Sequence, residues 1–120
     1  MQIIEGMNPA VAVDRDGAAI VVWEDHRNSY NYGDIYAQRL AADGTRLWSV
    51  DIFVNTSDDG IADQSSPAVA VDESGQVIIV WDDYRDSSYG IYAQRLDSNG
   101  NRLWVTDAQV SRDSGASRQE

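Results

Sequence analysis

Apolar segments and turn signals follow one another in an order that predicts β-strands. Residues 9–14 read PAVAVD, residues 19–25 read AIVVWED, and residues 34–40 read DIYAQRL; a less regular fourth segment spans 46–54. A continuous Val/Ile run is typical of a strand covered on both faces, and the mixed third segment is typical of a less buried strand. No segment has a sustained helical period, so the pattern predicts four consecutive strands.

The same order of segments recurs in the second half of the chain. PAVAVDRDGAAIVVWEDHR at 9–27 returns as PAVAVDESGQVIIVWDDYR at 67–85, and IYAQRLAADGTRLW at 35–48 returns as IYAQRLDSNGNRLW at 91–104. Of the 33 aligned positions 22 are identical, with offsets of 58 residues in the first pair and 56 in the second. Each repeat is therefore one structural unit, and a period of this length is typical of propeller blades and similar arrays.

Glycine turns support this assignment. Residues 14–17 and 72–75 lie between the first and second strands, and Asp43-Gly44 and Asn99-Gly100 lie between the third and fourth. Such dipeptides are the strongest short signal for a β-hairpin. Each unit is thus predicted to be a four-stranded antiparallel meander, which is the structure of a propeller blade.

The predicted fold class is all-β, with blade 1 at 1–58 and blade 2 at 59–120 in one continuous array. Propellers hold about four to eight blades, and repeat arrays bury apolar faces between neighbouring units. Both copies keep the same apolar positions, so neither resembles a polar cap. We expect homo-oligomerisation to complete the ring, with a trimer preferred and a tetramer next. A longer parent protein is the alternative source of further blades.

Charge and composition narrow the choice of partners. The formal net charge is −11 and the pI is about 4.2, so neither nucleic acid nor an anionic membrane surface is expected as a partner. The chain has no cysteine, which excludes disulfides and thiolate metal sites. The N-terminal segment MQIIEGMNP has no basic start and no long apolar run, so it does not read as a signal peptide.

The segments PAVAVD, VVWED-R, DIYAQRL and DG-RLW resemble blade repeats of bacterial β-propeller proteins that are loosely related to sialidase-like propellers. Residues 44–48 and 100–104 keep the Gly-to-Trp spacing of the Asp box found in sialidase-like blades, whereas Ala42 and Ser98 occupy its Asp position. Such proteins are often secreted, so the resemblance implies an extracellular or periplasmic location. It implies architecture more strongly than activity.

Strand direction separates two kinds of connection. The tight glycine turns share one end of each blade, which we call the turn end. The loops at 26–33 and 84–90 and the linker at 56–66 share the other, which we call the loop end. Long loops on a rigid frame commonly carry function, so we expect any binding face at the loop end.

The motif Trp-x-Asp-x-Arg occurs in both copies, at 23–27 and 81–85. Alternation places its three side chains on one strand face near the loop end. The motif can supply an acid and a base beside an aromatic platform, as a site for a sugar or small polar ligand would need. Alternatively, the Asp–Arg pair is structural and the Trp packs between blades. We favour the structural interpretation, because charge pairs more often serve structure and active sites usually break a repeat's symmetry.

Tyrosines gather beside Asn and Ser in the loops between the second and third strands. This composition is typical of adaptable binding surfaces, although tyrosine also suits packing against a neighbouring blade. We therefore predict a non-enzymatic binding or scaffold module for a carbohydrate or other small polar ligand. The alternatives are a fragment of a sialidase-like glycan-active enzyme and a purely structural segment of a larger protein. The candidate ligand-binding residues are Asp25, Arg27, Tyr30, Tyr32, Asp83, Tyr84, Arg85 and Tyr89.

We expect no catalytic residue, metal ion or cofactor. Sialidase catalysis needs an arginine cluster, a tyrosine nucleophile and an acid, and only Arg27 and Arg85 recur at the loop end. His26 is the only histidine, and a lone histidine is a poor metal site. The linker acids do not have the spacing of the twelve-residue calcium loop, so we interpret them as solvated, with calcium binding as the alternative. These acids are Asp58, Asp59 and Asp63.

Overall fold

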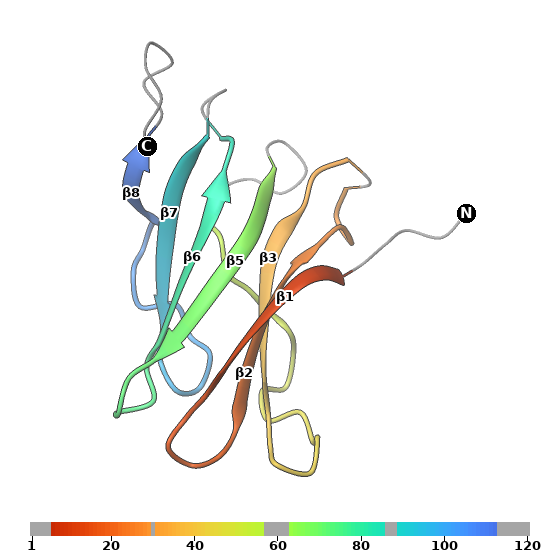
Figure 1. The fold of residues 1–120 in the computed structure, drawn as a ribbon, viewed down its shortest axis with the longest axis vertical. Helices are drawn as coiled ribbons and strands as arrows, with labels where there is room; N and C mark the ends of the chain where they lie inside the picture. The colour runs from red at the N-terminus through yellow and green to blue at the C-terminus, as the bar shows by residue number, and fades with distance from the viewer. Residues whose placement is uncertain (1–5, 30, 57–62, 86–88, 113–120) are drawn as a thin grey trace, which may run out of the picture.

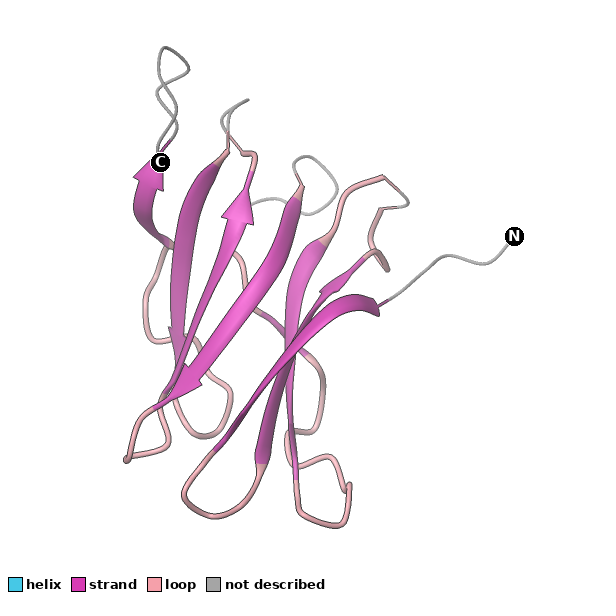
Figure 2. Ribbon diagram, viewed as in Figure 1, coloured by secondary structure: helices cyan, strands magenta, loops and turns pink. Residues whose placement is uncertain are grey.

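The structure is a computed structural model that describes residues 6–29, 31–56, 63–85 and 89–112. Within these ranges the regular elements are all β-strands (Figures 1 and 2). The described residues contain no helix long and apolar enough to cross a membrane. Blade 1 contains β1 (Gly6–Val13), β2 (Ala19–Asp25), β3 (Asp34–Leu40) and β4 (Ile52–Phe53). Blade 2 contains β5 (Gln64–Val71), β6 (Val77–Asp83), β7 (Gly90–Leu96) and β8 (Ala108–Arg112).

The strands form two four-stranded antiparallel sheets, each in chain order, which confirms the predicted fold class. The register also repeats: Val22 pairs with Ala37 in blade 1, and Val80 pairs with Ala93 in blade 2. Figure 1 shows the glycine turns at the lower end of both sheets and the β2–β3 connection at the upper end. The predicted boundary between residues 58 and 59 lies outside the described residues.

The first strand of each blade begins earlier than predicted. β1 and β5 start three residues before their prolines, and an irregular register follows their second residues. Asn8 and Ser66 occupy this bulge with φ angles of 52° and 54°. Positive φ is uncommon outside glycine. Its occurrence at the same position of both blades therefore makes this bulge a feature of the repeat itself.

The fourth strand of blade 1 is shorter than predicted. Its segment joins β3 first through a single bridge between Leu40 and Arg46, and regular pairing resumes only at Ile52. Between them the chain turns so that the backbone N–H of Trp48 donates to Oε1 of Gln38, 3.1 Å away. This side-chain bond takes the place of a ladder hydrogen bond, which explains the irregular segment.

The apolar core lies between the two sheets. Ile20 and Val22 of β2 belong to the same buried cluster as Val77, Ile79 and Trp81 of β6. In the repeat alignment, however, Ile20 corresponds to Ile78. Ile78 lies between Val77 and Ile79 in β6 and is not part of the buried cluster. Since successive strand residues point to opposite faces, the two blades bury opposite faces against each other.

Candidate functional site

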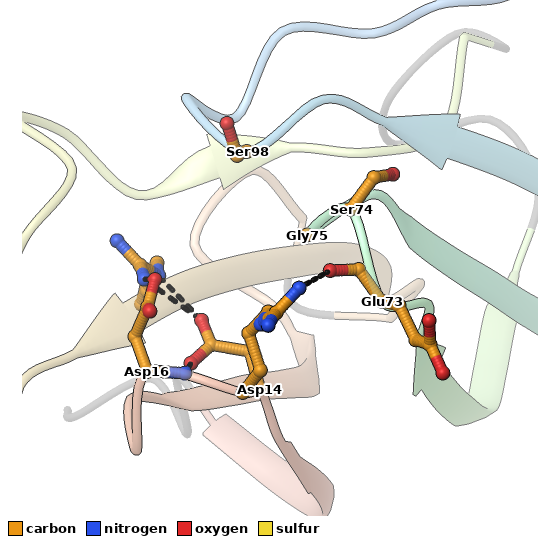
Figure 3. A pocket seen from close by; sticks show the side chains of 8 residues that line it. Asp14, Asp16, Glu73, Ser74, Gly75 and Ser98 are labelled. Atoms are coloured by element: carbon orange, nitrogen blue, oxygen red, sulfur yellow. Dashed lines mark hydrogen bonds and ion pairs between the residues drawn. The ribbon is translucent and has the colours of Figure 1, made fainter.

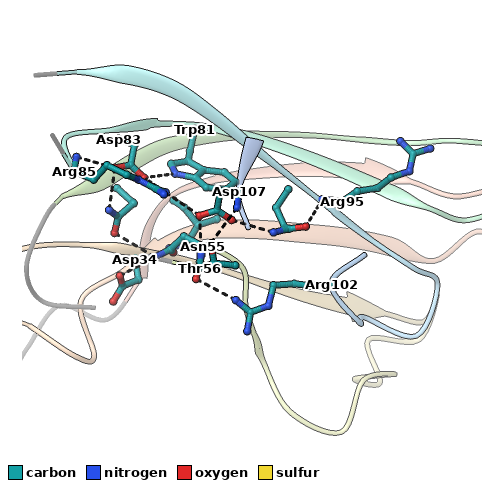
Figure 4. A network of polar contacts seen from close by, with 12 residues as sticks. Asp34, Asn55, Thr56, Trp81, Asp83, Arg85, Arg95, Arg102 and Asp107 are labelled. Atoms are coloured by element: carbon teal, nitrogen blue, oxygen red, sulfur yellow. Dashed lines mark hydrogen bonds and ion pairs between the residues drawn. The ribbon is translucent and has the colours of Figure 1, made fainter. Parts of the chain in front are cut away.

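The Trp-x-Asp-x-Arg motif of blade 2 is a hydrogen-bonded unit, in which only the buried Nε of Arg85 lacks a partner among the described residues (Figure 4). Oδ2 of Asp83 accepts from the indole N–H of Trp81 at 2.9 Å and from Nη2 of Arg85 at 2.7 Å. Nη2 of Arg85 also donates to Asp107 at 2.8 Å, and its guanidinium carbon lies 3.9 Å from the ring centroid of Tyr92. Asp83 and Asp107 are both buried, so this ion pair sits inside the blade.

Blade 1 repeats the arrangement. Oδ2 of Asp25 accepts from Trp23 at 2.7 Å and from Nη2 of Arg27 at 2.9 Å, and the guanidinium carbon of Arg27 lies 4.1 Å from the Tyr36 ring centroid. Burial alone would raise the pKa of Asp25, but hydrogen bonds from Arg27 and Trp23 outweigh burial and hold that pKa below its usual range. Asp25 is therefore a carboxylate whose oxygens already have partners, which supports the structural interpretation of the motif.

Sequence reasoning missed a second acid in each unit. Nη2 of Arg27 donates to Asp51 at 3.1 Å, just as Arg85 donates to Asp107. Gln38 and its counterpart in blade 2 hold the opposite oxygens of these acids, each through Nε2 at 3.0 Å. The signal was available, because a Trp-x-x-Asp sequence recurs at 48–51 and 104–107.

A second polar cluster joins the two blades near the loop end (Figure 4). Nδ2 of Asn55 lies 3.3 Å from Oδ1 of Asp34 and 3.4 Å from Oε1 of Gln64. Nε2 of Gln64 in turn donates to Oδ1 of Asp83 at 3.3 Å. These four side chains are fully buried, so the cluster fixes the blades against each other.

The loop-end tyrosines lie near the surface. The rings of Tyr84 and Tyr89 have centroids 4.9 Å apart and are tilted by 56°. Tyr84 is 42% exposed and Tyr89 is 51% exposed, and Tyr32 in the other loop is also exposed. Tyr30 lies outside the described residues. The structure thus pairs two candidate residues on one loop and leaves their rings accessible.

The linker acids are only partly described. Oδ1 of Asp63 accepts from the backbone N–H of Gly33 at 2.9 Å, which ties the linker to the first loop. Asp58 and Asp59 lie outside the described residues. Within the described ranges, no three acidic or histidine side chains are grouped to hold a metal ion.

At the turn end, a pocket of about 140 Å³ lies between the first turns of the two blades (Figure 3). Its polar groups engage one another: Arg39 lies 2.8 Å from Asp14, and Nη1 of Arg15 lies 3.5 Å from the carbonyl of Glu73. Pockets for small molecules usually measure about 300–1,000 Å³. The turn-end pocket is therefore suited to a few water molecules rather than to a sugar.

A scan against protein-family models finds no match, and a search of curated proteins finds none either. Among solved structures, the chain is similar to an endo-arabinase from Bacteroides thetaiotaomicron VPI-5482, with a TM-score of 0.56 and 19% sequence identity. The likeness covers 88% of this chain and 42% of the endo-arabinase chain, so the chain spans less than half the length of that protein. At this identity the likeness concerns the fold, and it agrees with the propeller-blade arrangement of the two sheets.

Proposed function

We propose that the protein is a β-propeller module that binds carbohydrate at its loop end without modifying it. The observation that carries the proposal is the accessible pair of Tyr84 and Tyr89. Aromatic rings offer flat apolar faces for sugar rings, and their hydroxyl groups donate and accept hydrogen bonds. Tyr32 extends this surface on the other loop.

The acids and arginines of the motif then position the surface. Asp83 and Arg85 stand at the end of β6, directly before and after Tyr84, and their internal hydrogen bonds fix the base of the loop. Asp25 and Arg27 do the same at the end of β2. Their partners within the blade leave the tyrosines as the groups that contact the ligand.

A glycan-active enzyme is the second candidate, and the likeness to an endo-arabinase favours it. Glycoside hydrolysis uses one carboxylic acid whose pKa is raised so that it can protonate the leaving group. Asp25 does not fit this role because its pKa is lowered by Arg27 and Trp23. Asp25 therefore favours binding over hydrolysis.

A glycan array that includes arabinan oligosaccharides tests the proposal. We expect binding to at least one glycan class, and we expect the double change Tyr84→Ser with Tyr89→Ser to weaken it roughly tenfold or more, as loss of a stacking pair would. Asp43→Ala at the turn end is the matched control and should leave binding unchanged. Equal binding by the tyrosine variant would overturn the proposed site. Release of reducing sugar from arabinan or from a fluorogenic sialoside would instead establish the enzymatic candidate.

A further inference from the structure

The two blades leave opposite faces uncovered. On blade 1 the uncovered face carries Val11 and Val13, which are 61% and 66% exposed, together with Val21 and Trp23; we call it outer face 1. On blade 2 the uncovered face carries Val110, which is 61% exposed, together with Ile78, Val80 and Trp104; we call it outer face 2. Both faces are predominantly apolar, and both lie on the surface of the isolated chain.

Each outer face has its buried counterpart inside the chain. Val110 corresponds to Val54, which is fully buried between the blades, and Trp104 corresponds to the buried Trp48. Val21 and Trp23 correspond to Ile79 and Trp81, which are buried on the other side of the same interface. Outer face 2 thus repeats the blade 1 side of the internal interface, and outer face 1 repeats its blade 2 side.

We infer that a second copy of this chain seats its outer face 1 on outer face 2, head to tail, and so repeats the internal interface between chains. The interface between the two blades of one chain serves as the template for this contact. Each of its two halves is present again on an outer face, so a second copy of the chain fits each outer face. This inference does not depend on the proposed carbohydrate function.

One contact of the internal interface is specific enough to be mapped residue by residue onto the contact between chains. The indole N–H of Trp48 donates to the backbone carbonyl of Ser98 at 3.0 Å, and a Cβ at Gly100 would lie 3.0 Å from Cδ2 of Trp48. The corresponding turn of blade 1 is open, since a Cβ at Gly44 would meet no atom within 4 Å. Between chains, Trp104 covers Gly44 of the next copy and donates to the carbonyl of Ala42.

This contact joins two different surfaces, so it is heterologous. Such contacts either close into a ring or continue as a fibre. With two blades per chain, three or four copies fall within the range of about four to eight blades found in propellers.

The internal interface also has a feature that the contact between chains lacks. The buried side chains Asp34, Asn55 and Gln64 correspond to Gly90, Ser111 and Gly6. Their hydrogen-bonded cluster is therefore absent from the repeated interface. We expect the contact between chains to dissociate before the blades of one chain separate.

Paired variants test the direction of assembly. Val11→Glu with Val13→Glu blocks outer face 1, and Ala108→Glu with Val110→Glu blocks outer face 2; all four positions are exposed in the isolated chain. We expect each variant alone to be a folded monomer by circular dichroism and native mass spectrometry. We expect their equimolar mixture to form a dimer with one copy of each, because one intact contact remains. A homodimer of either variant, or an oligomer of either at wild-type strength, would overturn the inference.

A milder pair of variants tests the Trp104 contact. Gly44 and Gly17 both have positive φ, at 90° and 83°, and both are open in the isolated chain, so Asn at either position meets the same backbone demand. Gly44→Asn places a side chain where Trp104 of the next copy would sit, and should raise the dissociation constant about 30-fold, as loss of an interface anchor does. Gly17→Asn should leave the constant unchanged. Equal constants for the two variants would contradict the Trp104 contact.

Discussion

Trp23 and Trp81 hold the same place in two nearly identical blades, yet their surroundings differ. Each indole N–H donates to the Asp two residues later, at 2.7 Å and 2.9 Å. Trp81 is 1% exposed because blade 1 covers it, whereas Trp23 stacks on Tyr36 and remains half-buried on outer face 1. The sequence expectation that both pack between blades is therefore met within the chain only by Trp81. In a repeat protein, burial is set by the neighbouring unit rather than by the blade's own sequence.

The largest expected effect comes from truncating the two tryptophans. Trp81→Ala should lower the free energy of unfolding by roughly 3–5 kcal/mol, the usual range for a buried aromatic. Trp23→Ala should lower it by about half as much in the dissociated chain, because part of that ring is already in solvent. Urea denaturation at concentrations that keep the chain dissociated measures both. Equal losses of unfolding free energy for the two variants would show that Trp23 and Trp81 are equally buried in the dissociated chain, which would contradict this comparison.

The arginines provide the next comparison. Arg85→Met leaves the buried acids Asp83 and Asp107 without their guanidinium and should cost about 3 kcal/mol, within the range for breaking a buried ion pair. Arg27→Met should cost less, about 2 kcal/mol: it also leaves the buried Asp25 without its guanidinium, but Arg27 is more exposed than Arg85 and Asp51 keeps its contact with Arg46. Thermal denaturation of the two variants side by side is sufficient. A larger loss for Arg27→Met would contradict the stronger burial of the blade 2 network.

The smallest effects concern two acids whose pKa values move in opposite directions. The pKa of Asp25 is lowered, so its stabilising contribution is present above the unfolded pKa of about 3.9 and is lost as pH falls through the lower folded value. Burial raises the pKa of Asp82, so ionised Asp82 destabilises the fold at neutral pH, and this penalty disappears below about pH 3.9. Denaturation at neutral pH should show that Asp25→Asn lowers the free energy of unfolding and that Asp82→Asn raises it slightly. Both differences from the unmodified protein should become smaller at acidic pH. If both variants changed the free energy of unfolding in the same direction at neutral pH, the opposite pKa shifts of Asp25 and Asp82 would be refuted.

Much of the fold was accessible from the sequence because repetition and turn chemistry act locally. Asp43-Gly44 and Asn99-Gly100 mark hairpins in any context, and the Val/Ile runs mark the central strands. The early starts of β1 and β5 were missed because pairing continues before a bulge at Asn8 and Ser66, and a proline directly after the bulge reads as the start of the strand. The shortened β4 was missed because a hydrogen bond from the Trp48 backbone N–H to Oε1 of Gln38 replaces part of the ladder.

The candidate site was predictable in outline but not in its partners. The repeated motif indicated the Asp–Arg pairs, but Asp51 and Asp107 lie on a later segment and approach only through the fold. The cluster of Asp34, Asn55 and Gln64 has no counterpart in the repeat, so comparing the two copies could not reveal it. Such contacts between units depend on how blades are placed, which a local pattern does not encode.

The central claim is that the two outer faces are the two halves of one interface. The most direct measurement is the solution mass of the folded 120-residue chain, by native mass spectrometry with light scattering at micromolar concentration. The account predicts three copies of the 13.3 kDa chain, with four as the next closed ring. A folded particle that stays at 13.3 kDa under these conditions would contradict it.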